Sequence, residues 1–160
     1  DTDTSLEESF ETLARWQSDG LIARIGVSNF AAWQVMKAQA VAHRLGTKID
    51  AIQPMYSLVK RQAEVELLPM AADQGITAYT YSPLGGGLLS GKYANGGAGR
   101  LTEDSRYAAR YAPDYMARAA ADLAALAADL GTHPATLAVA WAKSHPSGPI
   151  PLISARAGTC

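Results

Sequence analysis

Short apolar runs alternate with longer segments of helical periodicity through most of this chain. Helical patterns cover 4–20, 31–45, 62–74, 114–130 and 134–144, and short apolar runs cover 21–27, 51–53, 76–81 and 150–153. This alternation is typical of a parallel sheet covered by helices. Four strands at this spacing fit either half of an eight-stranded barrel or a small open sheet, and periodicity alone does not choose between them.

Local residues indicate where several of these elements begin or bend. Thr4 followed by Glu7 has the capping-box pattern of a helix start, and Pro134 suits a first helical position. Pro69 predicts a kink in the helix over 62–74, because proline removes one backbone donor. The stretch from 82 to 113 has no clear periodicity, and a loop of that length in a compact domain is usually functional or mobile.

The composition is that of an ordinary globular domain, and it excludes several classes of function. The 160 residues are 48% hydrophobic and 18% charged, with a formal net charge of -1. A net charge so close to zero gives no excess of positive charge that would attract nucleic acid or an anionic membrane surface. Cys160 is the single cysteine, and His43, His133 and His145 lack the spacing of metal ligands. We therefore expect no disulfide, no metal, and no nucleic-acid or membrane partner.

The start of the chain and its apolar runs indicate where in the cell the protein is located. No window approaches the ~18 consecutive apolar residues of a membrane span, and the first residues lack the basic and then apolar pattern of a signal peptide. We expect a cytoplasmic protein. Because the first residue is Asp1 rather than Met and the chain opens on a helix pattern, we also expect a fragment of a longer protein.

A glycine-rich loop directly follows the apolar run over 76–81. Gly85, Gly86 and Gly87 stand in succession, with Tyr81 before them and Lys92 after them. Ligands of parallel α/β folds bind at the carboxyl ends of strands, and glycines let a backbone approach a ligand closely. This pattern predicts that a nucleotide cofactor binds against the glycine-rich loop. The alternative is that the glycines serve the turn alone.

Three strand ends, at 25–30, 53–58 and 81–93, resemble blocks of the aldo-keto reductase family, and 1–9 and 131–141 match its pattern in the same order. The resemblance covers essentially the whole chain. It implies a (β/α)8 TIM barrel that reduces aldehydes and ketones with NADPH. The chain would be one domain over 1–160, the C-terminal half of that barrel, from the helix after strand four to strand eight. The catalytic residues of relatives lie upstream of Asp1, so none is carried over.

The resemblance also assigns residues to the nicotinamide end of an NADP(H) cofactor. Ser28, Asn29 and Gln53 correspond to the polar groups that hold the carboxamide, which needs both a donor and an acceptor. Tyr81 corresponds to the aromatic ring on which the nicotinamide stacks. Each also has a plainer alternative from the local sequence, because Ser28 and Asn29 suit a helix cap and Tyr81 suits a core.

Further residues correspond to those that contact the phosphates. The loop that passes the pyrophosphate corresponds to Ser82, Leu84, Gly85 and Gly87. Lys92 and Arg106 are candidate phosphate contacts, although solvated side chains are the ordinary alternative. Ser154 and Arg156 match the segment near the adenosine 2′-phosphate.

Other residues lack such an assignment. Tyr107, Tyr111 and Tyr115 fit either the mouth of a substrate site or a staple that holds the long loop, while Glu64 and Glu66 fit helix-surface charge.

The leading interpretation is part of an NADPH-dependent reductase that acts on a small-molecule carbonyl, completed by a missing N-terminal half. A non-catalytic NADP-binding regulatory subunit and an inactive truncated product are the alternatives. A third possibility is another barrel enzyme that shares only the phosphate-binding loop.

Overall fold

Within residues 3–154, which this computed structural model describes, parallel strands form a four-stranded sheet in the order β1-β2-β3-β4. The strands are β1 (Gly26–Ser28), β2 (Ala51–Gln53), β3 (Thr77–Thr80) and β4 (Ile150–Pro151). The predicted parallel sheet is confirmed. Because every strand runs the same way, their carboxyl ends meet at one edge of the sheet.

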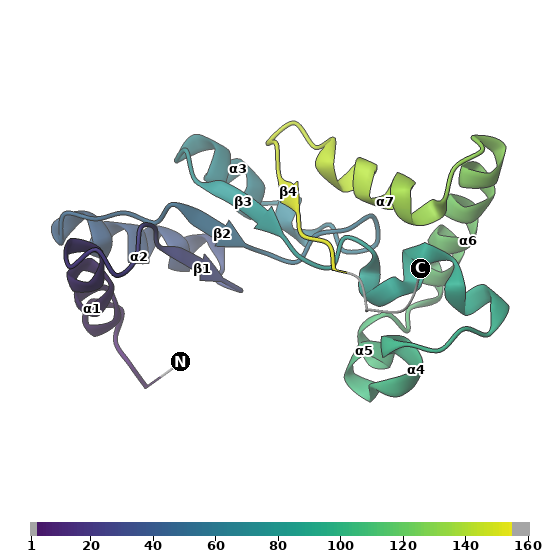
Figure 1. Cartoon of the computed structure of the whole chain (residues 1–160), viewed down its shortest axis with the longest axis horizontal. Coiled ribbons are helices and arrows are strands. Elements are labelled where there is room, and N and C mark those ends of the chain that lie inside the picture. The colour runs from purple at the N-terminus through teal and green to yellow at the C-terminus, as the bar shows by residue number, and fades with distance from the viewer. Residues whose placement is uncertain (1–2, 155–160) are drawn as a thin grey trace.

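Helices connect the strands and cover one face of the sheet. The longer ones are α1 (Leu6–Ser18), α2 (Ala32–Arg44), α3 (Leu67–Asp73), α6 (Asp114–Asp129) and α7 (Pro134–Lys143). Figure 1 shows α2 and α3 behind the sheet, while α6 and α7 lie toward the opposite end of the molecule.

The segment between β3 and α6 is a series of short helical turns rather than the irregular loop that we predicted. They are η2 (Gly85–Ser90), η3 (Lys92–Asn95), α4 (Arg100–Glu103) and α5 (Ser105–Arg110). Each has 4 to 6 residues. Helices this short complete too few turns to leave a periodic pattern in the sequence.

Two elements begin later than predicted. Ser5 rather than Thr4 is the cap of α1, because its Oγ accepts the N–H of Glu8 at 3.1 Å. The strand predicted over 21–27 begins only at Gly26, and Leu21 is 70% exposed. The apolar run thus extends beyond the part that the sheet buries.

The helix predicted over 62–74 is divided into η1 (Gln62–Glu64) and α3. Pro69 is the third residue of α3. Backbone N–H groups in the first turn of a helix have no partner within it, so proline costs nothing there. The predicted kink at Pro69 is therefore wrong, and the break lies ahead of it at residues 65–66.

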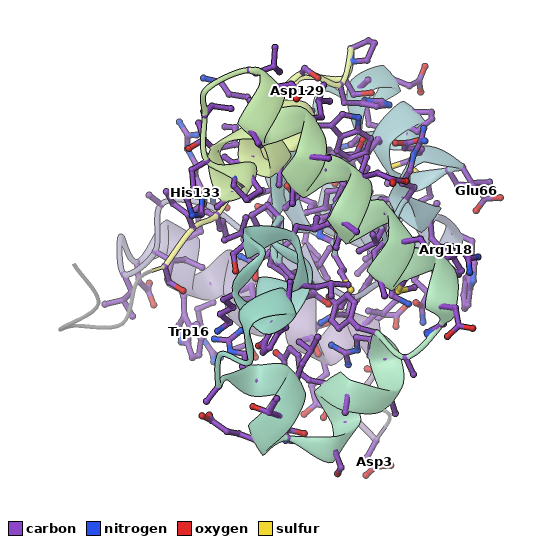
Figure 2. The ribbon with its side chains drawn as sticks, turned by 90° about the vertical axis from the view of Figure 1, so that its right-hand side faces the viewer. Asp3, Trp16, Glu66, Arg118, Asp129 and His133 are labelled. Carbon is purple, nitrogen blue, oxygen red and sulfur yellow. The ribbon has the colours of Figure 1, made fainter. Side chains whose placement is uncertain are left out.

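Buried apolar side chains form two clusters. The first, which we call the sheet cluster, includes Phe10, Val35, Ile52, Leu68 and Ala78. The second, which we call the loop cluster, includes Val59, Leu89, Tyr111, Met116 and Leu123. Helix α7 contributes Ala142 to the sheet cluster and Ala138 to the loop cluster. Figure 2 looks onto the end formed by α6, where Arg118 and Asp129 lie at the periphery.

The other face of the sheet is open. Ile52 and Ala78 point toward the helices and are buried, whereas Ser28 and Gln53, which are paired in register, are exposed. In β-strands alternate side chains point to opposite faces. The exposed side chains therefore line the face that the helices leave uncovered.

Membrane-spanning potential is confined to one bent pair of helices. No single helix within residues 3–154 is long and apolar enough to cross a membrane. The helices α6 and α7 meet the criteria of length and composition only when joined, and they are bent by 104° at the break.

Candidate functional site

Polar side chains from three strand ends meet at the carboxyl edge of the sheet. Ser28 Oγ donates a hydrogen bond to the main-chain oxygen of Gln53 at 2.9 Å. The Tyr81 hydroxyl donates to Asn29 Oδ1 at 2.7 Å. The structure thus brings together four of the predicted residues, although Tyr81 and Asn29 are 52 positions apart in the sequence.

The backbone at this edge adopts a conformation that is uncommon outside glycine. In the part of the chain that the structure describes, Asn29 and Ser82 are the non-glycine residues with positive φ, each at 58°. Asparagine tolerates this left-handed region better than most residues, whereas serine is held there at some cost. Such conformations cluster at functional sites, so both strand ends are candidate ligand-binding positions.

The helix-cap alternative for Ser28 and Asn29 is wrong. The N-cap of α2 is Ala31, whose backbone N–H donates to the side chain of Gln34 at 2.8 Å. The serine and asparagine side chains are engaged with Gln53 and Tyr81 instead. Their position is therefore explained by contacts at the sheet edge rather than by the helix that follows.

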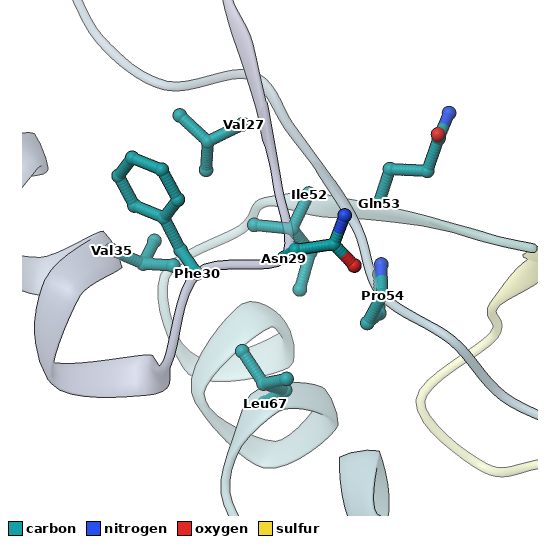
Figure 3. Close-up of a pocket in the computed structure, with 8 residues that line it drawn as sticks. All are labelled: Val27, Asn29, Phe30, Val35, Ile52, Gln53, Pro54 and Leu67. Carbon is teal, nitrogen blue, oxygen red and sulfur yellow. The ribbon is translucent and has the colours of Figure 1, made fainter. Parts of the chain in front are cut away.

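A small pocket lies beneath this edge, on the helical side. It is lined by Asn29, Gln53 and apolar side chains that include Val27, Phe30 and Leu67, and its volume is about 10 Å³. That is roughly the space of one water molecule, so a nicotinamide ring does not fit. Figure 3 shows the amide ends of Asn29 and Gln53 pointing away from Phe30 and Leu67. These amides are thus available to a ligand on the open face rather than in the pocket.

The backbone conformation and the packing of the glycine loop both explain why it contains glycines. Gly85, Gly86 and Gly87 all have positive φ, at 57°, 68° and 97°. A Cβ at Gly86 would lie 2.9 Å from Leu101 Cδ1, and one at Gly87 would lie 2.9 Å from Lys92 Cε. The turn and its packing therefore require glycine with or without a ligand.

Lys92 folds back over this loop. Its Nζ lies 4.8 Å from the centroid of the Tyr93 ring, and a Cβ at Gly87 would lie 3.3 Å from that Nζ. None of the ion pairs among residues 3–154 includes Lys92. Among the described residues, the Lys92 ammonium group thus has no carboxylate partner. It lies beside the backbone that we predicted to pass the pyrophosphate.

The other predicted phosphate contacts are placed differently. Arg106, on α5, forms an ion pair with Asp104 at 3.0 Å and has an 84% exposed side chain. The hydrogen bonds from Arg106 hold the pKa of the Asp104 carboxyl below its usual range. Ser154 is exposed at the last described position, and Arg156 lies outside the described residues. Ser82 and Leu84 are half-buried at the start of the glycine loop.

Two of the three tyrosines in the long segment act as a staple. Tyr111 is buried in the loop cluster, with its hydroxyl 3.8 Å from Met55 Sδ, and burial raises its pKa. Tyr107 packs against the same cluster, whereas Tyr115 is 53% exposed. The staple hypothesis is confirmed for Tyr107 and Tyr111.

An anchor that no sequence pattern predicted fixes the segment after β2. The Tyr56 hydroxyl donates to Glu64 Oε1 at 2.7 Å, and Arg61 Nη2 donates to Glu64 Oε2 at 2.8 Å. The Tyr56 ring lies 5.3 Å from that of Trp141 on α7, and its backbone N–H donates to the Tyr81 oxygen at 3.2 Å. Glu64 is thus part of an anchor rather than plain surface charge. The spacing of Arg61 and Glu64 was the one available signal.

This anchor predicts a pH dependence of stability. Hydrogen bonds from Arg61, helped by Tyr56, hold the pKa of Glu64 below its usual range in the folded protein. A lowered folded-state pKa adds stability that is fully present above the unfolded value of about 4.3 and is lost as the pH falls through the folded value. Urea denaturation between pH 7 and pH 3 is expected to show a steeper acid loss of stability in the wild type than in Glu64→Gln. Identical pH profiles would contradict the role of this carboxylate.

Within residues 3–154, no group of histidine, cysteine, aspartate and glutamate side chains is arranged to hold a metal ion.

Comparison with known proteins shows what this arrangement is similar to. The model of the aldo/keto reductase family matches residues 1–158. An uncharacterized oxidoreductase of Bacillus subtilis is 38% identical over an alignment of 155 residues that covers 93% of this chain and 44% of that protein. A probable voltage-gated potassium channel subunit beta of Oryza sativa is 34% identical over 158 residues, covering 92% of this chain and 47% of that protein.

A solved structure extends the similarity to the fold. The glycerol dehydrogenase of Gluconobacter oxydans matches with a TM-score of 0.77 and 26% identity, over 97% of this chain and 46% of that one. The chain thus spans about half the length of the relatives it matches. Its parallel strands and covering helices correspond to part of a (β/α)8 barrel.

Proposed function

Because the chain belongs to the aldo/keto reductase family, we propose that it forms the cofactor-binding half of an oxidoreductase that reduces aldehydes or ketones to alcohols. The observation that carries this proposal is the meeting of Ser28, Asn29, Gln53 and Tyr81 at the carboxyl edge of the sheet. That edge is where parallel α/β folds bind ligands.

The residues present fit a nicotinamide dinucleotide. Asn29, Ser28 and Gln53 offer amide and hydroxyl groups to a carboxamide, and the Tyr81 ring offers a face for stacking. Lys92 offers a cation beside the glycine loop. When bound, the cofactor supplies the hydride. The work of this chain is to hold and orient it.

The proposal includes the partners of the chain. We place residues 1–160 as the part of the barrel from the helix after strand four to strand eight, completed by the first half. The groups that protonate a small-molecule carbonyl substrate belong to that other half. A cytoplasmic setting, without nucleic-acid or membrane partners, belongs to the same proposal on the grounds of composition and charge.

A regulatory role is the second candidate. One relative is described as a potassium channel subunit beta, and it is 34% identical to this chain. In that case the same cofactor site would serve binding without turnover. The presence or absence of carbonyl reduction by the complete protein separates the two candidates.

We propose NADP(H) rather than NAD(H) as the cofactor. A 2′-phosphate favours nearby cations. In this proposal Ser154 and Arg156 lie near it, and Lys92 and Arg106 lie along the other phosphates. One contact to a charged group contributes roughly 1.5–3 kcal/mol, or about ten- to a hundredfold in affinity.

Fluorescence titration of the 160-residue chain with each reduced cofactor tests this preference. NADPH is expected to bind at least about tenfold more tightly than NADH, and Arg156→Ala is expected to narrow the gap. Equal dissociation constants would show that the 2′-phosphate is not recognised. Because the proton donors lie elsewhere, the chain alone is expected to oxidise no NADPH when a reactive aldehyde is added.

A further inference from the structure

The backbone of Tyr81 is held by one neighbouring segment, which follows β2. Strand β3 ends at Thr80, and Tyr81 lies just beyond it. The Tyr81 N–H donates to the Pro54 oxygen at 3.0 Å, and the Tyr81 oxygen accepts the Tyr56 N–H at 3.2 Å. Both main-chain hydrogen-bonding groups of Tyr81 are therefore used by residues 54–56, so the position of that segment fixes the backbone of Tyr81.

The Tyr56 side chain anchors this segment on the helical side of the sheet. Met55 pairs with Tyr81 across the parallel ladder, so the next side chain, that of Tyr56, points to the opposite face. Tyr56 is buried there, and the centre of its ring lies 5.3 Å from that of Trp141 on α7. The anchor thus joins a covering helix to the backbone that carries the Tyr81 ring.

A charge pair fixes the direction of the Tyr56 hydroxyl. The hydroxyl donates to Glu64 Oε1 at 2.7 Å. The Glu64 oxygens also accept two hydrogen bonds from Arg61, from Nε at 3.0 Å and from Nη2 at 2.8 Å. Burial raises the pKa of the Tyr56 hydroxyl, and Glu64 raises it further, so this hydroxyl remains a donor at neutral pH. Because a carboxylate held by two bonds has little freedom to turn, it offers Tyr56 one fixed acceptor.

We propose that Tyr56 is a positioning residue for the nicotinamide ring, because it fixes the backbone from which the Tyr81 ring projects. The inference rests on the proposed function, in which nicotinamide stacks on Tyr81. The glycine loop is held separately, since Gly86 packs against side chains of the loop cluster. The contribution of Tyr56 to binding is therefore confined to the nicotinamide end of the dinucleotide and does not include the phosphates.

The experiment compares two ligands that differ only at the nicotinamide end. NADPH and 2′-phospho-ADP-ribose, which has the same phosphates without nicotinamide, are each titrated calorimetrically into the 160-residue chain. Tyr56→Phe keeps the ring and removes the bond to Glu64. It is expected to weaken NADPH by about three- to tenfold, a fraction of the cost of losing a base-stacking ring, and to leave 2′-phospho-ADP-ribose within about twofold. Circular dichroism at the titration temperature checks that each variant is folded.

A double variant tests whether the effect passes through Tyr81. Tyr81→Ala removes the ring that is positioned, so adding Tyr56→Phe to it should not weaken NADPH further. If Tyr56→Phe does not fold, Glu64→Gln takes its place, because it keeps the Tyr56 ring and an acceptor but loses the charge pair with Arg61. Its expected effect has the same pattern between the two ligands and is smaller.

Tyr115→Phe is the matched control. Tyr115 lies on α6 and is 53% exposed, so this variant removes a tyrosine hydroxyl away from the segment after β2. Both affinities should remain at their wild-type values.

The possible failures are distinguishable. Equal weakening of both ligands by Tyr56→Phe would show a structural role only and overturn the inference, and so would unchanged binding of both. An effect of Tyr56→Phe that persists in the Tyr81→Ala background would overturn it as well. If the wild type binds NADPH and 2′-phospho-ADP-ribose equally, nicotinamide gains nothing from Tyr81, and the inference fails while dinucleotide binding stands. If neither ligand binds, the proposed function fails and this inference fails with it.

Discussion

Replacing Gly86 by alanine is expected to lower the free energy of unfolding by about 2–5 kcal/mol. Gly86 has a φ of 68°, where an L-residue with a Cβ pays roughly 1–2 kcal/mol. The added Cβ would also lie 2.9 Å from Leu101 Cδ1, 3.1 Å from Tyr107 Cδ1 and 3.2 Å from Tyr111 Cε2. Overpacking of this kind typically costs about 1–3 kcal/mol more.

Gly131 provides a matched control for the backbone part of this effect. Its φ is 63°, and a Cβ there would meet nothing within 4 Å. Gly131→Ala is therefore expected to cost only the conformational part, about 1–2 kcal/mol. Urea denaturation followed by circular dichroism measures both variants. Equal costs would show that the loop cluster yields to the new methyl group, and that close packing does not account for Gly86.

The second large effect is expected at Lys92. Lys92→Ala should weaken dinucleotide binding by about ten- to a hundredfold, the usual value of a charge-assisted contact. Because the pyrophosphate is common to NADPH and NADH, both should weaken to the same extent. The measurement is a fluorescence titration of the 160-residue chain with each cofactor.

Arg106→Ala is the informative comparison for Lys92. The Arg106 guanidinium must leave Asp104 before it can reach a phosphate, so its net contribution to binding is expected to be smaller. A larger loss for Arg106→Ala than for Lys92→Ala would reverse our assignment of the principal phosphate contact. An unchanged affinity in Lys92→Ala would remove the glycine loop from the proposed cofactor site.

Periodicity in the sequence was sufficient to predict the parallel sheet, and with it the edge where the carboxyl ends of neighbouring strands lie together. The polar residues at that edge, Ser28, Gln53 and Tyr81, were grouped by their resemblance to a known family rather than by periodicity. Their partners could not be predicted. The bond between Tyr81 and Asn29 depends on a left-handed backbone at Asn29, which several residue types adopt only when the surrounding structure requires it.

Other features were ambiguous for identifiable physical reasons. Thr4 and Ser5 are adjacent and either hydroxyl can cap a helix, so the sequence cannot decide between them. The anchor of Tyr56, Arg61 and Glu64 joins a buried ring to a charge pair, and the charge pair alone looks like ordinary surface.

Helix α7 reaches both buried clusters, through Ala142 on the sheet side and Ala138 on the loop side. Among the described residues, the segment after β2 also joins the two clusters, through Tyr56 on the sheet side and Val59 on the loop side. Two clusters that are joined at few points favour opening in cooperative parts rather than all at once. We expect the amide hydrogens of η2 and η3 to exchange with solvent when the region around the loop cluster opens locally. The amide hydrogens of β2 and β3 should exchange only when the whole chain unfolds. A dinucleotide bound to the glycine loop would slow hydrogen exchange mainly in η2 and η3. Because α7 contacts both clusters, amides of the sheet would also exchange somewhat more slowly.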